Sequence, residues 1–320
     1  MLQSAPKYNL TTGPQLTDNR TEEADRQLPI GEEIFLDHVG HFVRDPVAAG
    51  AALKRAGFAP TPVSVQSNPD GSPTGTGNIT AMFRRGYMEV LFKTADTPLG
   101  LEFQAALTGH SGVHLAAFSA ADAEGAHRRL REAGFAMRPL VQFQRPVDTV
   151  NGPDVAAFTV VRLDRGAMAE GRIQILAHRT ENTVWQPRWL THPNGAQGLI
   201  DLMVVSADPK EAADRFVRFT GHPAKPTKYG QAITLDRGQV QLVSRHAFEA
   251  MLPEIAIPQL PFLGAYAVRV QSLAAAETLL QREGMAMRRL GQALVVPFPS
   301  DIGLGAWLFV ENGRDLPWRV

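Results

Sequence analysis

The sequence predicts an α+β protein built from four copies of one βαβββ module, paired into two domains. Each domain is expected to form a cup of curved mixed sheet with its helices outside. Four segments combine a short apolar strand, a small or acidic residue and a helix, and they begin at Leu36, Gly112, Leu199 and Ala265. Four later apolar runs would close the modules, and they begin at Gly86, Gly171, Gly238 and Gly305. Because one such module cannot bury its sheet face alone, the modules are expected to pair.

The chain starts with a polar stretch, and its first strand follows soon after. Residues 1–32 show little periodic hydrophobicity, and we interpret them as an N-terminal arm. In the run FLDHVGHFV at residues 35–43, apolar residues alternate with polar or small ones, as in a half-buried strand. Asp45, which precedes a proline, is typical of a helix N-cap. Gly57, which precedes a phenylalanine, is typical of a helix stop.

The same signals recur along the rest of the chain. Gly134 repeats the helix stop in the second module, and Asp208 repeats the N-cap before proline in the third. Residues 181–198 contain prolines and an Asn-Gly pair, which indicates a linker. We therefore predict a first domain over residues 33–180, with modules one and two, and a second domain over residues 199–320, with modules three and four.

Comparison of the repeats selects the residues expected to face the cleft of each domain. Side chains on a strand alternate between faces, so His38 and His41 point to opposite faces of the first strand. When the repeats are aligned from the strand to the helix stop, His38 shares its position with His114 and Asp201. In the closing strands, the fourth position is occupied by Glu89, Gln174, Gln241 and Leu308.

Two histidines and one carboxylate that converge on one cleft from different strands indicate a divalent-metal site. We predict His38, His114 and Glu89 as ligands, with Gln174 adding a weak oxygen ligand. This donor set favours Fe, Mn, Ni, Co or Zn over Mg or Ca, which prefer oxygen ligands. The alternative is structural: the histidines are satisfied within a core, Glu89 pairs with an arginine, and Gln174 bonds to its strand neighbours.

A loop beside the predicted site offers a substrate contact. Residues 67–78, SNPDGSPTGTGN, are rich in Gly, Pro and Ser, and loops of this kind often carry binding residues. We predict Asn78 as a substrate-binding residue, although the stretch is equally consistent with a solvated connection. His110, in the run TGHSG, is a candidate acid–base residue or an ordinary loop histidine.

The composition argues against several classes of protein. The formal net charge is +0, and no basic cluster indicates nucleic-acid or anionic-membrane binding. No apolar run is long enough to span a bilayer, and the N-terminus lacks the pattern of a signal peptide. We therefore expect a cytoplasmic protein with no nucleic-acid or membrane partner. The chain has no cysteine, which excludes disulfides, thiolate metal sites and a cysteine nucleophile.

The sequence resembles the vicinal oxygen chelate superfamily, which includes glyoxalase I, extradiol dioxygenases and bleomycin-resistance proteins. The resemblance rests on LDHVGHFV, GVHLAAF, GYMEVLF and the four-module repeat, and it covers residues 34–312. More narrowly, the runs GTGN, GYMEV and WQPRWLTHPNGA are similar to those of bacterial proteins with a glyoxalase-like domain. The resemblance implies paired βαβββ modules and a metal at the strand positions given above, with Gln174 where an acidic residue is usual.

The expected function is that of a divalent-metal-dependent glyoxalase-like enzyme, an isomerase or lyase that chelates a small oxygenated organic substrate through vicinal oxygens. Glu89 is the expected catalytic base, which moves a proton next to a carbonyl. One alternative is an extradiol-type Fe(II) ring-cleavage dioxygenase, although the resemblance places the ligands of those enzymes in the C-terminal pair of modules. Another is a non-enzymatic small-molecule-binding protein of the bleomycin-resistance type. The second domain is expected to be a degenerate copy that supports the first or helps to form a homodimer.

Overall fold

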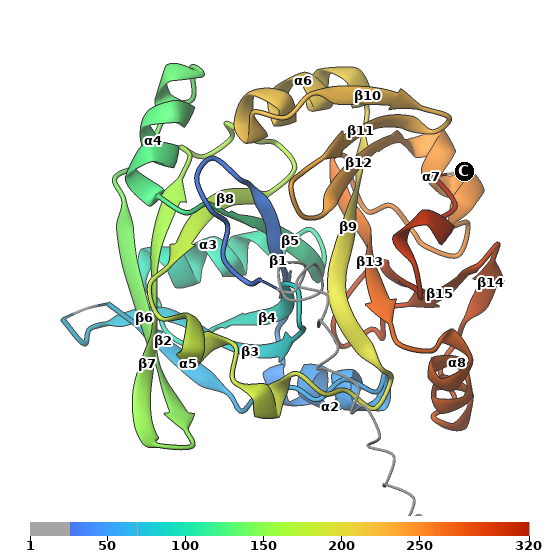
Figure 1. Cartoon of the computed structure of the whole chain (residues 1–320), viewed down its shortest axis with the longest axis horizontal. Coiled ribbons are helices and arrows are strands. Elements are labelled where there is room, and N and C mark those ends of the chain that lie inside the picture. The colour runs from blue at the N-terminus through green and yellow to red at the C-terminus, as the bar shows by residue number, and fades with distance from the viewer. Residues whose placement is uncertain (1–25, 69, 320) are drawn as a thin grey trace, which may run out of the picture.

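The computed structural model of the protein describes residues 26–68 and 70–319, and it contains two eight-stranded sheets with helices packed around them (Figure 1). The first sheet is a closed barrel in the order β1-β4-β3-β2-β6-β7-β8-β5. The second is an open sheet in the order β10-β11-β12-β9-β13-β16-β15-β14. The predicted α+β class with four βαβββ modules is therefore confirmed. Most of the predicted N-terminal arm, residues 1–25, lies outside the described residues.

Each module contributes four strands that pair in the same way. The first domain contains β1 (Phe35–Phe42), β2 (Ser64–Ser67), β3 (Pro73–Met82), β4 (Tyr87–Lys93), β5 (Gly112–Ser119), β6 (Val141–Thr149), β7 (Gly152–Arg162) and β8 (Arg172–His178). The second contains β9 (Ala196–Ser206), β10 (Ala224–Thr227), β11 (Gly230–Thr234), β12 (Gln239–Ser244), β13 (Phe262–Val270), β14 (Arg288–Leu290), β15 (Ala293–Pro297) and β16 (Ala306–Val310). In every module the opening strand pairs in parallel with the closing strand, and the opening strands of paired modules are antiparallel.

Two of the helices begin at the N-caps that the sequence predicts, Asp45 and Asp208. Asp45 Oδ1 accepts hydrogen bonds from the backbone N–H groups of Val47 and Ala48, and Asp208 does the same for the third module. These bonds satisfy N–H groups that have no partner within the helix. The helices are α2 (Pro46–Arg55), α3 (Pro98–Ala106), α4 (Ala123–Glu132), α5 (Glu181–Val184), α6 (Pro209–Thr220), α7 (Arg245–Met251) and α8 (Leu273–Arg282), with short 3₁₀ turns η1 (Pro187–Trp189) and η2 (Gly313–Asp315). Within the described residues, none of these helices has the length and apolar character needed to cross a membrane.

Helix α3 follows the first module and packs against the inside of the barrel. The ring of Phe103 on this helix stacks on Phe42 of β1, with centroids 4.1 Å apart. Leu91, Leu115 and Leu176 from three other strands belong to the same buried cluster. This part of the interior is therefore apolar, and it borders the polar cavity described below.

One hydrophobic cluster extends through both domains and holds them together. The ring of Phe58, which follows α2, lies 5.2 Å from that of Trp307 on β16. The ring of Phe118 on β5 lies 5.4 Å from that of Phe219 on α6. All four side chains are buried, and burial of aromatic side chains is among the largest contributions to packing. The two sheets therefore share this core, and each also has a buried cluster of its own.

His41 lies in this shared core and is bound by the second domain. Its Nδ1 lies 3.1 Å from the carbonyl oxygen of Ile302, and its Nε2 lies 2.8 Å from the hydroxyl of Tyr266. These partners suit a neutral ring that donates from Nδ1 and accepts at Nε2. Burial lowers the pKa of His41 to about 4. As the strand alternation predicts, His41 faces away from the residues that accompany His38.

This arrangement predicts that acid weakens the protein through His41. The folded state keeps His41 neutral down to about pH 4, whereas the unfolded chain binds a proton below about pH 6.5. The stabilisation is therefore complete above about pH 6.5 and is lost as the pH falls, by at most about 3 kcal/mol. His41→Gln keeps a donor and an acceptor but does not titrate, so its free energy of unfolding, measured with urea, should fall less between pH 7 and 4. The exposed His246→Gln is the control, and equal pH dependence in wild type and His41→Gln would contradict the prediction.

Candidate functional site

A polar cavity of about 60 Å³ lies inside the barrel of the first domain. It is bordered by side chains from seven of the eight strands. Its walls are formed by His38, Gln66, Asn78, Thr80, Tyr87, Glu89, Phe143, Arg145, Phe158, Val160, Gln174 and Leu176. Four of the five residues predicted for the site, His38, Glu89, Gln174 and Asn78, therefore lie around one cavity. Period-two alternation on β3, β4 and β8 brings their polar side chains to the inner face.

Glu89 is the acidic residue that lines the cavity, and two predicted residues hold it. Its Oε2 lies 3.5 Å from Nε2 of His38. Its Oε1 accepts a hydrogen bond of 2.5 Å from the side-chain amide of Asn78. Asn78 is therefore a neighbour of Glu89 on the adjacent strand β3, and it fixes one carboxylate oxygen while the other faces His38.

His38 is fixed on its other side by Asp37, which is fully buried. Nδ1 of His38 lies 2.7 Å from Oδ1 of Asp37, and Nε2 of His178 lies 2.9 Å from Oδ2. Burial alone would raise the pKa of Asp37, but the two imidazole partners hold it well below its usual range. The ionised carboxylate of Asp37 accepts N–H from both rings, and this contact turns Nε2 of His38 towards Glu89. The ring of Tyr87 stacks on His38 with centroids 4.3 Å apart and limits its rotation.

Arg145 brings a positive charge to the cavity wall. Its side chain is 7% exposed, and burial lowers its pKa, while the charges of Tyr87 and Glu89 act in the opposite direction. Arg145 also lines a neighbouring cavity of about 250 Å³, with Thr61, Ser64 and Trp189 among its other walls. Arg145 therefore borders both cavities, and its guanidinium group is suited to bind an oxygen-bearing ligand.

His114 does not join the other predicted ligands. Its ring packs on His110 with centroids 4.2 Å apart, and its Nε2 lies 2.9 Å from the His110 carbonyl oxygen. On the antiparallel strands β1 and β5, His38 pairs with Ala117, three residues beyond His114. At about 3.3 Å per residue, the two histidines are separated by about 10 Å along the strands.

The strand pairing explains this separation. One residue in each opening strand is left out of the register, Asp37 in β1 and His114 in β5. The residue after each of them resumes the pairing, so Leu115 occupies the position that corresponds to His38. Alignment of the repeats from strand start to helix stop therefore matched His38 with His114. In the structure, the residue equivalent to His38 is one position later, at Leu115. The predicted position of a second imidazole in the barrel is taken by a leucine.

Three of the remaining side chains offer donors that could hold a divalent ion. Within the described residues, no three or more His, Asp or Glu side chains are arranged to hold a metal. The cavity still offers the His38 nitrogen, the Glu89 carboxylate and the amide of Gln174, whose Oε1 also accepts from Arg172 Nε at 3.1 Å. Two donors at about 2.1 Å from one ion, at a right angle, lie about 3 Å apart, close to the observed His38–Glu89 distance. The carboxylate behind His38 is also a usual companion of metal-binding histidines.

The corresponding position of the second domain is filled by the chain itself. Asp201 is fully buried, and its Oδ2 accepts from Trp318 Nε1 and from Arg319, both at 3.1 Å. Burial raises the pKa of Asp201 to about 6, against the opposing effect of Arg319. Gln241, the counterpart of Glu89, is buried as well. The C-terminal residues therefore occupy the space in which the first domain keeps its polar cavity.

Sequence reasoning did not find Asp37, His178, Tyr87 or Arg145. A signal was present for His178, because period two from Gln174 places it on the same face of the closing strand. Asp37 stands beside His38 in an apolar strand, where an acidic residue is uncommon. No local pattern indicated Arg145, since its approach to the cavity depends on closure of the barrel between β2 and β6.

The comparisons with known proteins agree with the fold. A family model described as a glyoxalase-like domain matches residues 36–220. A hypothetical protein from Staphylococcus aureus is similar in structure, with a TM-score of 0.60, 9% identity, and coverage of 86% of this chain and 98% of that chain. A mutant of 4-hydroxymandelate synthase from Streptomyces coelicolor has a TM-score of 0.55, 14% identity, and coverage of 87% and 92%.

A third solved structure is a fusion of a xylose isomerase-like TIM barrel with 4-hydroxyphenylpyruvate dioxygenase. It has a TM-score of 0.51 and 11% identity, and the match covers 92% of this chain and 53% of that chain. No curated protein matches the chain. At these identities the solved structures show the shared fold alone.

Asp37→Asn tests whether one carboxylate holds both imidazoles. The amide can accept from one ring but not serve as an anionic acceptor for two, so the free energy of unfolding at neutral pH should fall by about 3 kcal/mol. Asp45→Asn is the matched control, because asparagine also serves as an N-cap and should change stability by only a few tenths of a kcal/mol. Urea unfolding measures both variants. Equal stability of Asp37→Asn and the control would contradict this account of the site.

Proposed function

The chain belongs to the family of glyoxalase-like domain proteins, and from this premise we propose that it is an enzyme that moves a proton next to a carbonyl group. The substrate is a small oxygenated organic compound, and the reaction is of the isomerase or lyase type. The observation that supports this proposal most is the pairing of Glu89 with a histidine that is anchored from behind, His38 on Asp37. The pair faces a cavity whose walls also carry a buried arginine.

Glu89 is the group that would accept the proton. Asn78 binds its Oε1, which leaves Oε2 to take the proton from the carbon beside the carbonyl. The electron pair of that C–H bond then stays on the substrate as an enolate. In a hydroxycarbonyl substrate, the hydroxyl proton then moves to the enolate oxygen, and the proton on Oε2 returns to the former carbonyl carbon. The carbonyl and hydroxyl groups have then exchanged places, so atoms and charge balance without a further reactant.

Two other features favour the charged intermediate state. The guanidinium of Arg145 lines the same cavity and would lower the free energy of a negative enolate oxygen. Tyr87 and Phe158 line the cavity as well, and their rings would shield a bound substrate from water, which would strengthen this attraction. A divalent ion held by His38, Glu89 and Gln174 would add Lewis-acid polarisation of vicinal substrate oxygens.

The cavity at Glu89 has room for the reacting oxygens but not for a whole organic substrate. At about 30 Å³ per water molecule, its volume is equal to about two waters. The neighbouring cavity beside Arg145, at about 250 Å³, is several times larger and would take the remainder of the substrate. We propose that the substrate enters from this side, between β2, β6 and the segment that contains α5 and η1.

Proton exchange tests the proposed reaction directly. In deuterated water, wild-type enzyme should catalyse exchange of the hydrogen beside the carbonyl in one or more of a panel of small hydroxycarbonyl compounds, followed by NMR. Glu89→Gln should reduce the rate by about 100-fold or more, as expected for loss of a general base. Glu124→Gln makes the same chemical change at an exposed position on α4 and should leave the rate unchanged. Exchange by Glu89→Gln at the wild-type rate would contradict the assignment of the base.

Metal analysis tests the proposed ligands and separates the alternatives. Mass spectrometry of protein purified without a tag should find a divalent metal that His38→Ala loses and His114→Ala retains. Metal lost from His114→Ala but kept by His38→Ala would overturn the assignment of ligands. Oxygen consumption with catechols, without proton exchange, would instead support the dioxygenase alternative, and binding without turnover would support a binding protein.

A further inference from the structure

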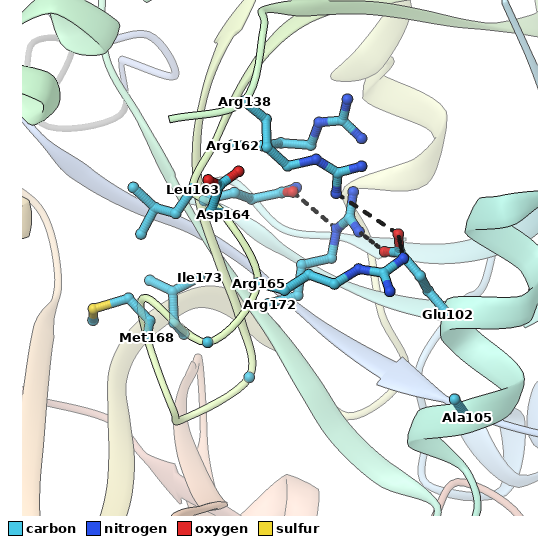
Figure 2. A pocket seen from close by; sticks show the side chains of 13 residues that line it. Glu102, Ala105, Arg138, Arg162, Leu163, Asp164, Arg165, Met168, Arg172 and Ile173 are labelled. Carbon is cyan, nitrogen blue, oxygen red and sulfur yellow. Dashed lines mark hydrogen bonds and ion pairs between the residues drawn. The ribbon is translucent and has the colours of Figure 1, made fainter. Parts of the chain in front are cut away.

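A third cavity, about 330 Å³ in volume, is lined by four arginines and lies between α3 and the β7–β8 connection (Figure 2). The arginines are Arg138, Arg162, Arg165 and Arg172, and the acidic residues in the same wall are Glu102 and Asp164. Positive groups therefore exceed negative ones by two. In Figure 2 the guanidinium groups gather on one side around Glu102, while Leu163, Met168 and Ile173 form an apolar wall on the other.

The carboxylate of Glu102 cannot accept hydrogen bonds from all of the N–H donors around it. Arg172 Nη1 lies 3.3 Å from its Oε2, Arg138 Nη1 lies 3.7 Å from its Oε1, and Arg165 forms a close ion pair with it. A carboxylate accepts about four hydrogen bonds, whereas three guanidinium groups offer about fifteen N–H donors. Most of these donors therefore remain available to a ligand or to water.

Arg162 adds a charge that Glu102 does not bind directly. Among the described residues, its buried Nε has no hydrogen-bond partner. Burial lowers the pKa of Arg162, and repulsion from Arg138 lowers it further. Burial also lowers the pKa of Arg172 to about 10. An anion in the pocket would relieve this repulsion and supply the missing acceptor.

We propose that this pocket binds a small organic anion. Its carboxylate or phosphate group would lie against Arg138, Arg162 and Arg165, whose planar guanidinium groups match either anion in a two-bond geometry. Its apolar part would pack on Leu163, Met168 and Ile173. A volume of this size is typical of small-molecule sites, which combine apolar walls with a few convergent polar groups.

The pocket is separate from the site at Glu89. Of the residues that line the two cavities, Gln174 alone borders both of them. Arg172 donates to the Gln174 side chain and so fills part of the boundary. The inference therefore does not rest on the proposed proton transfer, and a substitution in one cavity should leave binding in the other unchanged.

Titration calorimetry with two probes, benzoate and inorganic phosphate, tests the proposal on the full chain. Arg165→Gln is the principal variant, because its side chain is largely exposed and its loss should not affect folding. Arg162→Gln is the second variant, and thermal unfolding checks that it remains folded. Each should weaken binding of the preferred probe by about tenfold or more, as expected for loss of charge-assisted hydrogen bonds.

Arg128→Gln is the matched control, since it removes the same charge from an exposed position outside the pocket. Unchanged affinity in Arg128→Gln and in His38→Ala supports the proposal. Tighter binding of benzoate identifies the ligand as a carboxylate, and tighter binding of phosphate identifies it as a phosphate. Equal weakening by Arg128→Gln, loss of binding in His38→Ala, or no binding of either probe to the wild type would overturn it.

Discussion

The antiparallel pairing of β1 with β5 is the constraint on which the first domain depends. Val39 lies opposite Ala116 near the middle of this pair, and the two modules are arranged around it. Closure of the barrel then fixes which residues face inward from the other strands. The parallel pairing of β1 with β4 brings His38 beside Glu89, and the antiparallel pairing of β1 with β5 places His114 three residues away along the strands. The site is therefore decided by register, since a shift of one residue exchanges the face that a side chain occupies.

Local signals in the sequence were sufficient for the modules and for several residues of the site. Helix caps such as Asp45 act within a few residues, and strand alternation correctly separated the environments of His38 and His41. The closing strands placed Glu89 and Gln174 at one cavity because their repeats share a regular register. These features depend on short stretches of chain, which a single sequence contains in full.

The place of His114 could not be predicted in the same way. Its environment depends on the residue that each opening strand leaves out of register, and on the antiparallel direction of the two repeats. Both are properties of long-range pairing, which alignment of one module on another does not contain. The same holds for Arg145, which reaches the cavity only after β6 closes the barrel beside β2. Asp37 binds its neighbour His38 on β1 and also His178 on β8, a strand that is far along the chain.

The two domains resolve the same problem of buried charge in different ways. In the first domain the carboxylate of Asp37 is satisfied by two imidazoles, and a cavity remains beside them. In the second domain Asp201 binds Trp318 and Arg319 of the C-terminal segment. A buried charge without partners is costly, so each arrangement stabilises its own sheet. In the first domain, polar side chains still border a cavity. In the second domain, the buried carboxylate instead binds the C-terminal segment.

The most direct test of the central claim is X-ray diffraction from crystals soaked in Mn²⁺ or Zn²⁺, with anomalous data that locate the ion. The account predicts an anomalous peak inside the barrel, within bonding distance of His38 Nε2 and the Glu89 carboxylate. A peak bound by His114 and His110, with none at His38, would contradict it.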